Sequence, residues 1–104
     1  MLANASLAAA TLTSLYTCAA PTRTVAELSL CNTGAADTPV RVAIVQGTGQ
    51  PGAANWIEYD RVIGAAAKAG NGPLTRSIAL KPNQALWVYA LAAGVAAVLS
   101  GIEE

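Results

Sequence analysis

Residues 85–102 read ALWVYALAAGVAAVLSGI, and this stretch decides the fold class. It carries no charge over eighteen residues, so it reaches the lower limit for a membrane-spanning helix. Its first part, however, is rich in aromatic and β-branched residues, and Trp87 and Tyr89 are two apart, on one face of a strand. A spanning helix more often places such rings near its ends. We therefore predict two strands joined by a tight turn, with a spanning helix over 85–102 as the main alternative.

The composition favours a small protein built from aliphatic side chains. The chain has 104 residues, enough for one domain with a two-layer core. Hydrophobic residues make up 54% of it, charged residues only 12%, and Phe is absent. Six basic and six acidic residues give a formal net charge of zero, which argues against nucleic acid or an anionic membrane as a partner. A neutral, apolar surface instead favours burial against other subunits.

Short strand-like runs alternate with turn residues along the chain, at intervals typical of a sandwich or barrel. In 24–32, for example, Ala26, Leu28 and Leu30 share one face. We predict an all-β fold, a compact antiparallel β-sandwich or barrel of about seven to eight short strands. Residues 65–72 are expected to form a flexible loop or a helical turn. The predicted strands cover residues 12–18, 24–32, 40–45, 55–62, 74–80, 85–91 and 95–99.

The N-terminal residues are expected to behave differently from the rest. Short Ala-rich segments seldom hold one conformation in water without a partner, so residues 1–10 are predicted to be an arm that becomes ordered on a larger lattice. Residues 11–104 are predicted to form a single β-sandwich domain. The first twenty residues are apolar but have no Lys or Arg before the apolar part, so we expect mature chain rather than a signal peptide, and cytosolic synthesis.

The inventory of reactive side chains argues against an enzyme. The chain has no His to serve as a base, a proton shuttle or a metal ligand. Glu58 and Asp60 are two apart on a predicted strand and could share one face as a carboxylate pair, but charges at alternate positions more often mark the solvated face of a strand. We therefore predict no catalytic residues and expect Glu58 and Asp60 to face solvent.

Cofactor and metal sites are not predicted either. The glycine-rich loop 47–52 lacks the Lys followed by Ser or Thr that a phosphate-binding loop requires, and another strand follows it instead of a helix. Two cysteines are too few for a four-ligand metal site within one chain. A hairpin could bring Cys18 and Cys31 together as a disulfide, but cytosolic synthesis favours two free, buried thiols acting as small hydrophobic side chains.

The sequence also predicts where the large aromatic side chains lie and how one charged residue within an apolar strand is satisfied. Trp87 is expected to lie at least partly in the core because its strand is the most apolar one in the chain. Trp and Tyr elsewhere are predicted to form core or subunit contacts, with a carbohydrate platform as a further alternative. Arg41 interrupts an apolar strand whose two faces look covered, so a carboxylate or carbonyl groups should satisfy its charge, with Asp60 and Glu58 as the nearest carboxylates by strand order.

Several short motifs, taken in order, resemble a known group of proteins. The string begins with Leu15-Tyr16-Thr17 and Pro21 and continues with Leu28-Ser29-Leu30-Cys31-Asn32-Thr33-Gly34, Val40-Arg41-Val42-Ala43-Ile44 and Ile57-Glu58-Tyr59-Asp60. This layout resembles small virion structural proteins of tailed bacteriophages, and the likeness spans nearly the whole chain. Cys18 departs from it, because a branched aliphatic residue is expected there. The resemblance implies a β-sandwich that coats or joins other virion proteins, and it carries over no catalytic residue.

The expected function is that of a non-enzymatic virion structural protein, synthesised in the host cytoplasm. The resemblance favours a capsid decoration or cement protein that binds repeated lattice sites as an oligomer, with a trimer favoured, and a tail or fibre component is the alternative. A small membrane-anchored lysis factor that spans with 85–102 is the further alternative. Partners would be a major capsid or tail protein and further copies of the chain. Candidate interface residues are Gly47, Gln50, Pro51, Trp56, Tyr59, Lys68, Trp87 and Tyr89.

Overall fold

The computed structural model describes residues 1–65 and 74–104, and within these residues the chain forms eight strands and no helix. Turn residues separate the strands, as the sequence indicates. The all-β prediction is therefore confirmed. The strands are β1 (Ala3–Ser6), β2 (Thr13–Thr17), β3 (Thr24–Asn32), β4 (Thr38–Gln46), β5 (Trp56–Ile63), β6 (Leu74–Leu80), β7 (Gln84–Ala90) and β8 (Val95–Glu103).

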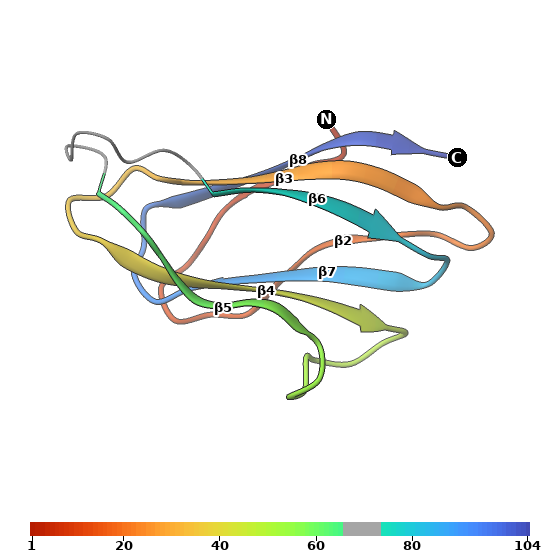
Figure 1. Ribbon diagram of the computed structural model, residues 1–104, viewed down its shortest axis with the longest axis horizontal. Helices are drawn as coiled ribbons and strands as arrows, with labels where there is room; N and C mark the ends of the chain where they lie inside the picture. Colours follow the sequence, from red (N-terminus) through yellow and green to blue (C-terminus); the bar gives the residue numbers. More distant parts are fainter. Residues whose placement is uncertain (66–73) are drawn as a thin grey trace.

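The strands form two antiparallel four-stranded sheets, which lie as two layers in Figure 1. One sheet has the order β1-β8-β3-β6 and the other the order β2-β7-β4-β5. Except between β4 and β5, each described strand is followed along the chain by a strand of the opposite sheet. Two four-stranded sheets interleaved in this way form an eight-stranded jelly roll, a form of β-sandwich.

The alternation of side chains explains why the two layers pack. In β3, Leu28 and Leu30 are fully buried, while Val25 on the opposite side is 69% exposed. The core lies between the inner faces of the sheets and is aliphatic, which agrees with the absence of Phe. Its largest fully buried hydrophobic side chains are Leu28, Leu30, Leu80, Leu86, Leu99, Val40, Val42, Val88 and Val95.

The decisive stretch 85–102 forms most of β7 and β8, so both predicted strands are present, but they do not pair with each other. β7 pairs with β2 and β4, whereas β8 pairs with β1 and β3 in the other sheet. The turn at 91–94 carries the chain across the sandwich, with Gly94 at φ 104°. The two strands therefore lie in opposite layers, and their apolar faces meet across one core. No helix among the described residues is long and apolar enough to cross a membrane.

Residues 1–10, predicted as an arm, contain strand β1 in this structure. β1 pairs antiparallel with β8, from Ala3 opposite Leu99 to Ser6 opposite Ala96. The following Leu7 is only 2% exposed and belongs to the core. In this structure the apolar residue at its end and the edge of β8 give the segment a place to pack. That residues 1–10 become ordered only on a larger lattice stays a prediction.

The two cysteines are both free, and one is buried while the other is exposed. β2, which ends just before Cys18, and β3, which contains Cys31, belong to different sheets, so the predicted hairpin does not form. Cys18 is buried, as predicted. Cys31 is exposed, which corrects the prediction: Leu30 and Asn32 on either side point inward, so the alternation of β3 turns Cys31 outward.

Candidate interaction surface

The described candidate residues gather on one side of the sandwich, at the outer face of the β2-β7-β4-β5 sheet and its adjoining loop. Trp87 and Tyr89 come from β7, and Trp56 and Tyr59 come from β5. Gly47, Gln50 and Pro51 belong to the loop between β4 and β5, which extends from this layer in Figure 1. Lys68 lies outside the described residues. The sequence predictions therefore converge on a single surface, although they were made strand by strand.

Arg41 is the centre of a group of rings on this face, and we refer to Arg41, Trp56, Tyr59 and Tyr89 as the aromatic–arginine cluster. The guanidinium carbon lies 4.1 Å from the ring centre of Tyr59, 5.0 Å from that of Tyr89 and 6.0 Å from that of Trp56. These distances are in the range of cation–π contacts. Trp56 and Tyr59 also meet edge to face, with ring centres 5.4 Å apart and an interplanar angle of 70°.

Asp60 fixes the orientation of the Arg41 side chain. Nε of Arg41 donates to Oδ1 of Asp60 at 2.7 Å, and Nη2 donates to Oδ2 at 3.3 Å. The hydrogen bonds raise the pKa of Arg41 above its ordinary value. The prediction that a carboxylate or carbonyl groups satisfy Arg41 is confirmed, and the partner is the carboxylate of Asp60. Because the two side chains are 28% and 48% exposed, water screens the ion pair, and its main effect is to hold the guanidinium against the rings.

A β-bulge in β5 brings Asp60 to this position. Val40 of β4 pairs with Arg61 and Val42 pairs with Glu58, so Tyr59 and Asp60 together stand opposite a single residue of β4. Asp60 adopts a φ of 54°, in the left-handed region that Asp tolerates better than most residues. Asp60 faces solvent, as predicted, but Glu58 does not, which corrects the prediction for that residue; the bulge turns the two carboxylates apart, so the alternative of a carboxylate pair on one face is not met either.

Glu58 instead contributes to closing the sandwich between the edge strands β5 and β6. Its carboxylate lies 2.7 Å from Nη1 of Arg76 in the opposite sheet and 3.6 Å from Nη1 of Arg61. The Glu58 side chain is only 15% exposed, so these contacts compensate for its burial. The role of Glu58 is to connect the two sheets.

A second contact between the sheets involves the end of β8. Tyr16 of β2 donates its hydroxyl hydrogen to Glu103, and Thr22 donates to the same carboxylate at 2.7 Å. These hydrogen bonds lower the pKa of Glu103, while burial, followed by the hydrogen bond to Glu103, raises the pKa of Tyr16. The contact fastens β8 to the opposite sheet, away from the aromatic–arginine cluster.

Trp87 lies on the outer face and not in the core, which corrects the prediction. Its neighbours Leu86 and Val88 take the inward positions of β7 and are fully buried. Trp87 is half-buried and stands opposite Ala43 of β4, which is also fully buried. The residue therefore packs against the outside of the sheet, and its Nε1–H is buried without a hydrogen-bond partner among the described residues.

Two shallow hollows flank these rings. Ala53, Trp56 and Tyr59 line a hollow of about 360 Å³ beside the aromatic–arginine cluster. A second hollow, of about 250 Å³, lies beside the ring of Trp87. Its lining residues are Ser14, Thr17, Gly47, Thr48, Gly49, Ala85 and Trp87. The surface thus combines protruding rings with recesses, which suits a shaped contact with another molecule.

We expect Trp87→Phe to change the free energy of unfolding by less than about 1 kcal/mol. Phe keeps most of the ring that covers Ala43 and removes a buried donor that has no partner, so the two effects oppose each other. Trp87→Ala uncovers Ala43 and should cost about 2–3 kcal/mol, less than the loss of a fully buried Trp. Urea unfolding of both variants measures this, and equal losses would contradict the orphaned-donor interpretation.

Comparison with protein-family models, curated proteins and solved structures finds no match for this chain. Among residues 1–65 and 74–104, no three His, Cys, Asp or Glu side chains lie close enough together to hold a metal ion. Sequence reasoning found the rings and the charge of Arg41, but it missed that they form one cluster, because the pairing of Arg41 with Tyr89 across β4 and β7 is set by the sheet order.

Proposed function

We propose that this chain is a non-enzymatic structural protein of a bacteriophage virion, which binds repeated sites on the capsid through the outer face of the β2-β7-β4-β5 sheet. The observation that carries the proposal is the aromatic–arginine cluster. Its side chains are available at the surface: Tyr59 is 57% exposed, and Trp56, Tyr89 and Arg41 are half-buried. A tail or fibre position on the same virion is the alternative.

The chemistry of the cluster is that of a protein contact. Trp, Tyr and Arg are the residue types most enriched among the side chains that dominate binding energy at interfaces. Here Arg41 is already held by Asp60 and by the rings, so little side-chain freedom is lost when a partner covers it. The neighbouring hollow at Ala53 would receive a side chain of the partner. A preorganised patch of this kind supports binding without any catalytic group.

Two further features support a partner in a virion. The first is the resemblance of the sequence to small virion proteins of tailed bacteriophages. The second is an analogy of fold: eight-stranded jelly rolls recur in viral capsid proteins, although they also occur in lectins and other proteins. Many identical sites on a lattice would allow a modest contact per copy to give stable coverage.

The opposite face of the sandwich supports association between copies. Val25 of β3 and Ile102 of β8 are paired neighbours there, and they are 69% and 62% exposed. Exposed aliphatic side chains in adjacent strands are a common feature of subunit contacts. We propose a closed oligomer, and the resemblance favours a trimer, because closed rotational symmetry gives every copy the same contacts.

The test is the binding of purified protein to particles that lack it. We expect Tyr59→Ala to weaken binding at least tenfold, since truncation of a central interface ring typically costs more than about 1–2 kcal/mol. Thr75→Ala, an exposed position on the other sheet, is the control and should bind as the wild type does. Equal binding by both variants, or absence of the protein from purified particles, would overturn the proposal. Hundreds of copies per particle indicate the head or tail surface, and a handful indicate a vertex or tip.

A further inference from the structure

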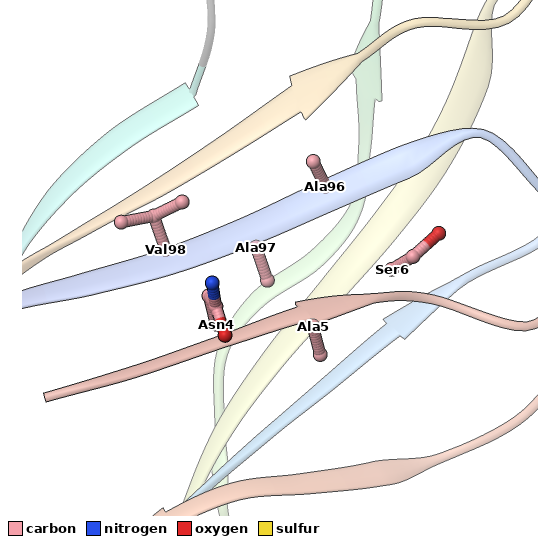
Figure 2. Close-up of a pocket in the computed structure, with 6 residues that line it drawn as sticks. All are labelled: Asn4, Ala5, Ser6, Ala96, Ala97 and Val98. Carbon is pink, nitrogen blue, oxygen red and sulfur yellow. The ribbon is translucent and has the colours of Figure 1, made fainter. Parts of the chain in front are cut away.

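The first strand, β1, is the shortest of the eight described strands. β1 has only four residues, lies at the edge of its sheet and is followed by a segment, 7–12, that leads to β2 in the opposite sheet. In Figure 2, Asn4 and Ser6 lie alongside Ala96 and Val98 of β8 on the outer side, while Ala5 and Ala97 point to the other side. These six residues line a hollow of about 290 Å³. The contact between β1 and β8 is thus shallow and made by small side chains.

The segment that holds β1 against its own β8 contains a strained residue. Ala10 has a φ of 51°, a left-handed conformation that is unfavourable for an L-residue with a Cβ. The backbone N–H of Ala10 donates to the carbonyl of Ala90 at 2.9 Å, and Thr11 donates its hydroxyl hydrogen to the carbonyl of Ala9 at 3.0 Å. These two hydrogen bonds keep the hinge folded back. A short hinge under strain favours the exchange of the element that it connects.

We propose that β1 and Leu7 exchange between copies of this chain, so that β1 of one copy fills the place on β8 of its neighbour. The contacts are the same in both arrangements: the register from Ala3 opposite Leu99 to Ser6 opposite Ala96, and the burial of Leu7. Exchange therefore loses no packing energy. It releases the strain at Ala10 and gives up the two hinge hydrogen bonds.

The structure also explains why β1 does not remain detached. Leu7 is 2% exposed, and its N–H donates to the carbonyl of Val95 at 2.9 Å, so withdrawal of β1 exposes a core position and the edge of β8. β1 and Leu7 of another copy can cover the edge of β8 and fill the core position again. The five hinge residues 8–12 reach roughly 17 Å when extended, which is enough to pass to an adjacent copy. This inference concerns the isolated chain and does not rest on the proposed virion location.

An engineered disulfide distinguishes the two arrangements directly. Asn4 and Val98 lie directly opposite each other in the register. Hydrogen-bonded and non-hydrogen-bonded pairs alternate along two antiparallel strands, and Leu7 and Val95 form a hydrogen-bonded pair, so Asn4 and Val98 form a non-hydrogen-bonded pair. The Cα atoms of such a pair are about 4.5 Å apart, within the range for a disulfide. The double variant Asn4→Cys/Val98→Cys, made together with Cys31→Ser to remove the exposed native thiol, should form this bond on oxidation.

The readout combines sedimentation of the oxidised protein with its size on a denaturing, non-reducing gel. We expect oligomers at high protein concentration whose chains remain covalently joined on the gel and separate on reduction. The single variants Asn4→Cys and Val98→Cys, in the same Cys31→Ser background, control for collisional cross-linking. Oligomers whose chains run as monomers on the gel would overturn the proposal, as would a protein that stays monomeric at every concentration reached.

The hinge variant Ala10→Gly provides an independent test without cysteines. Gly adopts a positive φ at little cost, so this change relieves the strain in the unexchanged form and should shift the equilibrium away from exchange by roughly tenfold per hinge. Ala8→Gly is the control, because Ala8 lies in the same hinge without a positive φ. Equal effects of the two substitutions on the dissociation of the oligomer would show that hinge strain does not drive exchange.

Discussion

Leu28→Ala should reduce the free energy of unfolding by about 2–5 kcal/mol, the range for truncating a fully buried Leu. Leu28 lies in the middle of β3, between the paired strands β6 and β8, and none of its surface is exposed. Its loss leaves a cavity between two sheets that are held by backbone hydrogen bonds on both sides, so the surrounding strands cannot easily collapse into the space. For a domain of about 100 residues this is a large part of the total stability.

Chemical denaturation followed by Trp fluorescence measures the effect. The matched control is Glu27→Ala on the same strand, where the side chain is exposed and truncation should change stability by no more than about 0.5 kcal/mol. A large loss for Glu27→Ala together with a small one for Leu28→Ala would mean that the two faces of β3 are reversed, and the sandwich described above would be wrong.

Gly101→Ala should destabilise the fold by about 3 kcal/mol or more, at the upper end of the range for overpacking. A Cβ on residue 101 would stand 2.2 Å from the carbonyl oxygen of Val25 and 2.5 Å from the Cα of Ala26. Both obstacles are backbone atoms of the neighbouring strand, so no side-chain rotation relieves the collision. The end of β8 must move away from β3, which also weakens the hydrogen bonds that Glu103 accepts from Tyr16 and Thr22.

The control for this prediction is Gly52→Ala, in the loop before β5. A Cβ there would meet only the side-chain oxygen of Asn55, at 3.6 Å, and Gly52 has no positive φ. This variant should be neutral or slightly stabilising, because Ala restricts the unfolded chain. Amide hydrogen exchange should show lost protection at the end of β8 in Gly101→Ala alone, and unchanged protection there would contradict the predicted displacement of the strand.

The alternation of residues along the sequence determined which segments form seven of the eight described strands, all but β1, and which of their side chains share a face. It also determined that the core is aliphatic and that Arg41 needs a partner. These conclusions depend on local rules, the two-residue repeat of a strand and the cost of an unpaired buried charge, so one chain read in order is sufficient. The strand over 24–32 was predicted with the bounds that β3 has in the structure.

The tertiary structure decided which strands pair and which of two faces points inward. Strands β7 and β8 follow each other closely in sequence, yet they belong to different sheets, because each pairs with strands from more distant parts of the chain: β7 with β2 and β4, and β8 with β1 and β3. Trp87 and Cys31 were assigned to the interior from their hydrophobic character, but their neighbours fill the core and leave them outside. Alternation separates two faces of a strand without saying which one the other sheet will cover.

The candidate surface likewise depends partly on the sequence and partly on the tertiary structure. Its rings and its arginine were visible in the sequence, but the cluster exists only because β4 lies between β5 and β7. The bulge at Tyr59 and Asp60 then turns one carboxylate toward Arg41, while Glu58 turns toward Arg76. Strand order and bulges arise from contacts between distant segments, and these contacts depend on how all the strands together cover their apolar faces. The local sequence pattern therefore determined most of the strands and the two faces of each. Only the packing of the whole chain determined which strands lie side by side and which side chains meet in the cluster.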